Sequence, residues 1–238
     1  MATYVISDIH GEYRMFMRML KKIQLNDTDK LYVLGDMIDR GPNPMKVILE
    51  LMEMPNAVCL LGNHEYLALE CLEIFQQEIT DEVLESLDKE TLRKFLNWNE
   101  CGNSSTVKSF CRSNQKIQKN VIQFIKRLVL YKEVIVEGRK YLLVHGGLGN
   151  FSRDKRLEDY TAEELVWERM DYSRKYFEDK YIVTGHTPTQ YIWEGKNPGY
   201  VYQAKNHIAI DCGACYPRGR LAVVCLETRE EFYVERRF

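Results

Sequence analysis

Short apolar runs alternate with stretches of helical periodicity along the first sixty residues. Three apolar runs bounded by turn residues predict strands at 3–6, 31–34 and 57–61. Between them, residues 12–23 carry apolar side chains at helical spacing, and residues 45–54 form a second amphipathic stretch that ends before Pro55. The order strand, helix, strand, helix, strand predicts right-handed crossovers and a largely parallel sheet.

The pattern becomes almost entirely helical over residues 65–131, which we interpret as an insertion. Helical periodicity predicts four helices, at 66–77, 80–98, 106–111 and 115–128. Such an insertion either forms a cap beside a functional site or simply covers a sheet edge, and the pattern leaves both open. If part of it reaches a site, we expect that part to be the turn at 99–104.

Strands return in the second half of the chain. They are predicted at 133–136, 139–144, 181–184, 199–203, 207–211, 220–227 and 231–235, with a short helix through 167–169. We expect the second half to be mostly antiparallel. The expected fold class is therefore α/β: one domain over residues 1–238, in which two sheets of mixed strands pack face to face as a sandwich flanked by helices.

Composition narrows the possible partners. The formal net charge of the 238 residues is −2, and the sequence pI is near 6.3, so there is no basic footprint for nucleic acid or an acidic membrane. No apolar run is long enough to span a bilayer, and the first residues lead straight into a strand, so we expect a cytoplasmic protein. Seven cysteines suit reduced thiols, and we interpret Cys212-Gly-Ala-Cys215 as a tight turn.

Polar residues of a particular kind follow five of the predicted strands. They are Asp8, His10, Asp36, Asn63, His145 and His186. Carboxyl ends of strands are where α/β sheets place ligand chemistry, and oxygen and imidazole donors with one bridging carboxylate suit two divalent cations. We expect Asp8 and His10 to bind one ion, Asp36 to bridge, and Asn63, His145 and His186 to bind the other. His207 and Asp211 are expected to belong to a strand and to its structural hydrogen bonds.

The motifs also carry a family resemblance. They are Asp8-x-His10-Gly, Gly35-Asp36-x-x-Asp39-Arg40-Gly, Gly62-Asn63-His64-Glu65, His145-Gly-Gly and Gly185-His186-Thr. In this order, over residues 3–226, the chain resembles the phosphoprotein phosphatases, the calcineurin-like metallophosphoesterases. The resemblance implies the same two-sheet fold and the same ligand set, with Mn, Fe or Zn as the possible metals.

The resemblance also implies roles for residues that are not ligands. A hydroxide bridging the two ions would attack phosphorus, and His64 would protonate the leaving group, with Asp39 raising the pKa of its imidazole. Arg40, Asn63 and Arg169 would bind the phosphoryl group, Arg169 matching the Trp-x-Arg of bacterial and phage members. Many relatives have an arginine where this chain has Leu61.

Two enzymatic activities fit these residues. We expect first a phosphomonoesterase of the short bacterial and phage type, acting on phosphoserine or phosphothreonine in proteins, because the Asp39-Arg40 pair and the His-Gly-Gly form favour it. The alternative is a dinucleoside polyphosphate hydrolase of the same fold. A degenerate phosphate-binding module would have lost a ligand or the acid, and a nuclease would need a more basic surface. The oligomeric state stays open.

Overall fold

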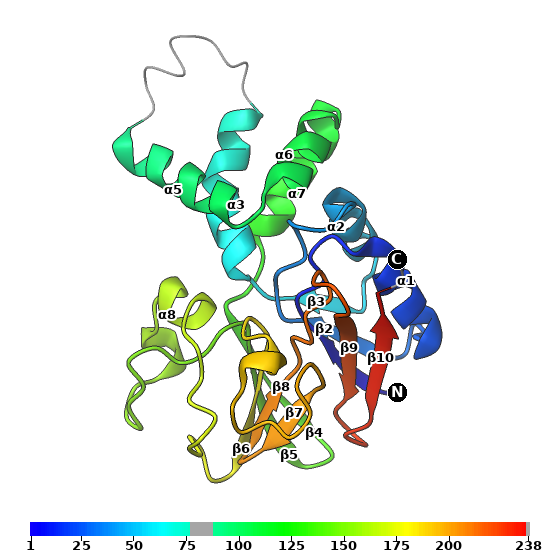
Figure 1. Cartoon of the computed structure of the whole chain (residues 1–238), viewed down its shortest axis with the longest axis vertical. Helices are drawn as coiled ribbons and strands as arrows, with labels where there is room; N and C mark the ends of the chain where they lie inside the picture. Colours follow the sequence, from blue (N-terminus) through cyan, green and yellow to red (C-terminus); the bar gives the residue numbers. More distant parts are fainter. Residues whose placement is uncertain (77–87, 237–238) are drawn as a thin grey trace.

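Two five-stranded sheets form the centre of the protein (Figure 1). The computed structural model describes residues 1–76 and 88–236. The first sheet has the order β10 (Glu231–Glu235), β9 (Arg220–Cys225), β1 (Thr3–Ile6), β2 (Lys30–Val33) and β3 (Ala57–Cys59). Strands β1, β2 and β3 are parallel, as the sequence predicts, whereas β9 and β10 pair antiparallel.

The second sheet is mixed. Its order is β4 (Tyr131–Val136), β5 (Arg139–Val144), β6 (Lys180–Thr184), β8 (His207–Ala209) and β7 (Tyr202–Ala204). Strands β5, β6 and β8 run parallel, and only the β4–β5 and β7–β8 pairs are antiparallel. The antiparallel pairing expected of most of the second half thus holds for two of the four pairs in this sheet, and the direction of β6 relative to β5 and β8 differs from it. The segment after β5 crosses over before β6 begins, and parallel neighbours require such a crossover.

The two sheets pack face to face. Side chains from both contribute to one buried cluster, which includes Val5 and Val224 of the first sheet and Leu143, Val183 and Ile208 of the second. Alternate residues of each strand point into this layer because the side-chain period of a strand is two. The predicted sandwich is confirmed, and it aligns the carboxyl ends of β1, β2, β3, β5 and β6.

Helices form two groups beside the sheets. Helix α1 (Tyr13–Lys22) packs on β9 and β10, and α2 (Pro44–Met52) packs beside α1. The helices α3 (Asn63–Phe75), α5 (Lys89–Glu100), α6 (Ser104–Cys111) and α7 (Gln115–Lys126) pack on one another and on α2. Trp98, Phe110 and Val121 of the insertion share one buried cluster with Ile6 and Leu31 of the sheet. The insertion is thus continuous with the main core, and Figure 1 shows its helices grouped at one end of the molecule.

Two predicted helices differ from the structure. The start expected at Thr80 lies outside the described residues, and α5 begins at Lys89. The short helix α8 (Ala162–Val166) ends before residues 167–169, because Trp167 is already its C-cap and the following chain leaves the helix. No helix among the described residues has the length and apolarity needed to span a bilayer.

Candidate active site

The predicted ligands lie on loops whose backbone is held in an uncommon conformation. Asp8, His10, Asp36 and His186 have φ angles of 51°, 44°, 53° and 60°. The left-handed region costs a non-glycine residue about 1 kcal/mol or more. Four such residues at adjoining strand ends indicate that the fold holds their side chains in place at the expense of local backbone stability.

Two imidazole nitrogens lie close to the side-chain oxygen of Asn63. Oδ1 of Asn63 is 2.9 Å from Nε2 of His145 and 2.9 Å from Nδ1 of His186. The other nitrogen of each ring faces a backbone carbonyl, that of Leu34 at 2.6 Å and that of Trp167 at 3.1 Å. Each imidazole therefore donates its proton to the backbone and turns a lone pair toward the amide oxygen. Three acceptors without a donor between them fit a cation.

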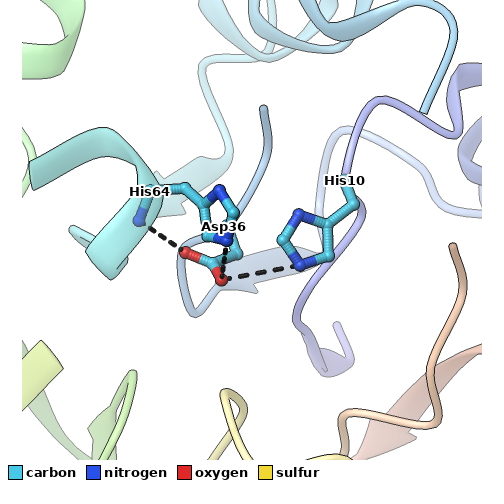
Figure 2. Close-up of side chains that lie close together, drawn as sticks. All are labelled: His10, Asp36 and His64. Atoms are coloured by element: carbon cyan, nitrogen blue, oxygen red, sulfur yellow. Dashed lines mark hydrogen bonds and ion pairs between the residues drawn. The ribbon is translucent and has the colours of Figure 1, made fainter. Parts of the chain in front are cut away.

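Asp36 lies between this group and a second one. Its Oδ1 is 3.4 Å from Nε2 of His145, and its Oδ2 is 3.6 Å from Nε2 of His10. Nδ1 of His10 donates to the carbonyl of Ile38 at 2.9 Å, and its Nε2 is 3.9 Å from Oδ1 of Asp8. Figure 2 shows the Asp36 carboxylate facing the rings of His10 and His64. This is the arrangement expected of a bridging carboxylate.

Burial sets the charges of these groups. Burial raises the pKa of Asp8 to about 6 and that of Asp36 well above its usual value. Burial also lowers the pKa of His145 to about 4 and that of His186 to about 2, which keeps both rings neutral. Neutral imidazoles and buried carboxylates match the donor set of a dinuclear divalent-metal centre. The residues fit the two metals, whose identity among Mn, Fe and Zn they leave open.

The acid expected at His64 is held by a network that reaches into the insertion. Nδ1 of His64 lies 2.6 Å from Oδ2 of Asp39. Trp98 donates its indole N–H to that same oxygen at 2.7 Å, and the hydroxyl of Thr106 donates to Oδ1 at 2.5 Å. All four side chains are buried. Sequence reasoning missed Trp98 and Thr106, because nothing local to them marks a contact with the loop after β2.

The electrostatics of His64 differ from the expectation. Burial, Arg40 and His145 lower the pKa of His64 well below its usual value, whereas we expected Asp39 to raise it. Asp39 is itself buried, which raises its pKa to about 7 against the opposing hydrogen bonds from Thr106 and Trp98. In this state the ring is neutral, with its proton on Nδ1 and its Nε2 lone pair turned toward the centre.

Arg40 extends across the centre. Its guanidinium donates to Nε2 of His10 at 2.8 Å and to Nε2 of His64 at 3.0 Å. Its backbone N–H donates to the carbonyl of Gly102 at 3.0 Å, and its Nε–H to that of Cys101 at 3.4 Å. The prediction that the turn at 99–104 reaches the site is confirmed. Through this turn the insertion fixes Arg40, which we expect to bind phosphate.

Glu65 is a second residue whose role the motif did not reveal. Its buried carboxylate accepts backbone N–H groups from Asp36 and Met37, each at 2.8 Å, and from Ile38 at 3.1 Å and Gly62 at 3.2 Å. It therefore fixes the loop that carries the bridging carboxylate. A Cβ at Gly62 would lie 2.2 Å from Oδ1 of Asp36, so only glycine fits there.

An open cleft of about 390 Å³ exposes the centre. Its lining includes the ligands Asp8, Asp36, Asn63 and His186, the two arginines Arg40 and Arg169, and the aromatic residues Trp167, Tyr191 and Tyr216. Arg169 lies just beyond α8 and reaches the cleft, as expected of a phosphate-binding residue.

Two polar residues expected to be structural do not line this cleft. His207 lies in β8, where its Nε2 donates to the carbonyl of Arg174 at 2.9 Å, and Asp211 accepts the N–H of Gly213 at 2.9 Å.

Comparisons with known proteins agree with this geometry. A family model described as calcineurin-like phosphoesterase matches residues 1–214. A symmetrical bis(5'-nucleosyl)-tetraphosphatase of Nitrosospira multiformis is 32% identical over 102 residues, which are 40% of this chain and 37% of the relative. The match thus spans little more than a third of that relative's length.

Solved structures share the fold over nearly the whole chain. One described as a putative diadenosine tetraphosphatase has a TM-score of 0.65 and 15% identity, and the match covers 98% of this chain and 93% of that one. A protein serine/threonine phosphatase from Saccharomyces cerevisiae has a TM-score of 0.60 and 15% identity, covering 98% of this chain and 79% of that one. Such low identities establish the fold alone.

Proposed function

The chain belongs to the calcineurin-like phosphoesterase family, and from that membership we propose that it hydrolyses the phosphoanhydride chain of dinucleoside polyphosphates. Metal-dependent phosphoester hydrolysis follows from the family and from the ligand clusters around Asp36. The relatives support the substrate, because those matched are named symmetrical bis(5'-nucleosyl)-tetraphosphatases. They favour our alternative expectation over the protein phosphatase we placed first.

The wall of the cleft carries the proposal. Three aromatic residues, Trp167, Tyr191 and Tyr216, line it together with the two arginines. Trp167 and Tyr191 remain 38% and 65% exposed, although large aromatic side chains are usually covered. Exposed rings stack on nucleobases at about 1–3 kcal/mol per base, while arginine forks bind the phosphates. A phosphate-binding centre with stacking surfaces at its mouth suits a nucleotide better than a bare phosphoester.

The chain's own residues can be assigned to steps of this reaction. Arg40 and Arg169 would bind the phosphoryl oxygens and hold the chain across the cleft. Bound divalent metals would supply charge neutralisation and an acidified water at neutral pH. His64 turns a ring nitrogen toward the centre, where it can hold or deliver a proton to the departing oxygen, and Asp39 keeps that ring oriented.

A phosphomonoesterase remains the second candidate because of this same pair. A nucleoside di- or triphosphate leaves readily without a proton, whereas the alkoxide of phosphoserine needs one. The buried Asp39–His64 pair, supported by Trp98 and Thr106, is the apparatus that such a poor leaving group requires.

A side-by-side assay separates the two candidates. The Mn-loaded protein is given diadenosine tetraphosphate and a phosphoserine peptide, with metal content measured on the same sample. We expect the larger kcat/KM for the dinucleotide, with His145→Ala as a control that loses both activities together with metal. A large advantage for the peptide would reject the dinucleotide as substrate and leave the phosphomonoesterase.

A further inference from the structure

A basic hollow of about 740 Å³ lies between α1 and β10. Figure 1 shows these two elements side by side at one edge of the molecule. Five cationic side chains line the hollow: Arg18, Lys21 and Lys22 of α1, Arg220 of β9, and Arg236 after β10. None of the residues lining this hollow lines the active-site cleft, so the two are separate places on the surface.

Positive charge in the hollow is not balanced by the described residues around it. Glu235 is the one carboxylate in its lining, and its Oε1 lies 3.8 Å from Arg220. Glu12 pairs with Arg236 at 3.1 Å. Across residues 1–76 and 88–236, no carboxylate lies within 4.0 Å of the charged nitrogens of the three α1 cations that line the hollow. In a chain with a net charge of −2, such a local excess favours an anion.

A solvated helix end explains only part of this cluster. Lys21 and Lys22 occupy the last turn of α1, where cations complement the helix dipole. That explanation does not extend to Arg220, which comes from a different element at the far end of the chain. The helix dipole therefore explains two of the five cations, but it does not explain why cations from three segments of the chain meet at this hollow.

Backbone carbonyls hold several of these groups in position without neutralising them. The guanidinium of Arg18 donates to the carbonyl of Glu235 at 3.2 Å, and Lys22 donates to that of Tyr233 at 2.8 Å. Arg220 donates to the carbonyl of Gly199 at 3.1 Å and lies 4.0 Å above the ring of Tyr200. The charges are thus directed and retained, which lowers the entropy cost of binding an anion.

We propose that this hollow is a second, non-catalytic site that binds a small molecule carrying a polyphosphate chain. Arginine forks and lysine ammonium groups match the repeated anionic oxygens of such a chain, and the volume suits a small ligand. Tyr200 lies at the rim, where it is 40% exposed and Arg220 already stacks on its ring. Two ligands carry such a phosphate chain: a nucleotide and a free polyphosphate. The proposal does not depend on the reaction at the metal centre.

Calorimetric titration of the full-length, metal-free protein tests this. The probes are tripolyphosphate, ADP and adenosine, and the variant is Arg18→Gln/Lys21→Gln, whose two side chains are exposed. Lys116→Gln/Lys119→Gln on α7 is the control, because it removes the same charge from exposed positions outside the hollow. We expect two classes of site for tripolyphosphate, one of them in the cleft. The first variant should weaken the other class about tenfold or more, and the control should not.

Two further measurements locate the site and identify the ligand. Tripolyphosphate should protect residues 18–22 and 231–236 from hydrogen exchange in the wild-type protein. Tighter binding of ADP than of tripolyphosphate would indicate a nucleotide, and the reverse a free polyphosphate. Hydrolysis of p-nitrophenyl phosphate by the Mn-loaded variants should stay unchanged. The proposal would be overturned if tripolyphosphate shows a single class of site whose affinity Arg18→Gln/Lys21→Gln does not change. Equal weakening of tripolyphosphate binding by Lys116→Gln/Lys119→Gln would also overturn it.

Discussion

Replacing Thr106 by valine tests whether the insertion controls the acid at the metal centre. The Thr106 hydroxyl donates to Oδ1 of Asp39 at 2.5 Å and accepts the backbone N–H of the same residue at 2.9 Å. Valine keeps the shape and removes both interactions. Asp39 then keeps Trp98 and His64 as partners on its other oxygen alone.

The expected cost has a structural part and a functional part. A buried group left without a partner costs about 1–3 kcal/mol, so the two groups freed here should lower the free energy of unfolding by about 2–6 kcal/mol. Because the bond from Thr106 lowers the pKa of Asp39, its loss should raise that pKa further above about 7. A protonated Asp39 cannot accept the proton of His64 Nδ1. On acidification, the variant should therefore lose activity at a higher pH than the wild-type protein does.

Urea unfolding and a pH profile of kcat on the Mn-loaded protein measure the two parts. Thr106→Ser is the control, since it keeps the hydroxyl and loses one methyl group. We expect the acidic limb of the profile to move upward in the valine variant and not in the serine variant, with kcat at neutral pH about tenfold lower. If both variants lose stability alike and neither limb moves, Thr106 is a packing residue and the reasoning fails.

Four further outcomes are expected. His64→Asn should reduce turnover of phosphoserine far more than that of p-nitrophenyl phosphate, and equal losses would remove His64 as the acid. Glu65→Gln should lower the free energy of unfolding by about 2–4 kcal/mol in urea, because an amide nitrogen would face backbone donors; an unchanged midpoint would contradict this. Hydrogen bonding to Lys155 lowers the pKa of Glu164 to about 2. The ionised Glu164 carboxylate therefore stabilises the folded state fully above about pH 5, and this contribution is lost toward pH 2. The Tm difference between wild type and Glu164→Gln should close over that window, and a constant difference would refute it. Adding Mn at about a hundred times its Kd should stabilise the fold by about 2.7 kcal/mol, which a chelator reverses; no shift in Tm would argue against the centre around Asp36.

The ligands could be predicted because each follows a strand directly. Parallel strands bring their carboxyl ends to one edge, so residues such as Asp8, Asp36 and Asn63 must meet there once β1, β2 and β3 pair in parallel. The local sequence sets both the strand and the residue after it. No knowledge of distant packing is needed for that inference.

Trp98 and Thr106 could not be predicted in the same way. Each looks like an ordinary helix residue, and its partner Asp39 lies 59 or 67 positions earlier. Their contact depends on how α5 and α6 pack back over the loop after β2, which no local pattern records. The direction of β6 escaped prediction for a related reason, since a crossover with little helix resembles an ordinary long loop.

The hydrogen bonds from the insertion argue against its acting as a free lid over the centre. Moving the turn at 99–104 away would break the bonds from Arg40 to the carbonyls of Cys101 and Gly102, and would strip Trp98 from Asp39 inside the core. The bond between Trp98 and Asp39 is buried and that from the Arg40 guanidinium is charge-assisted, so the loss of either costs about 1–3 kcal/mol. This wall is therefore fixed to Arg40 and Asp39. Among residues 1–76 and 88–236, no hydrogen bond joins the turn Thr189–Tyr191 to the predicted ligands, and Tyr191 is 65% exposed at the cleft. We therefore expect adaptation to different substrates to come from this turn.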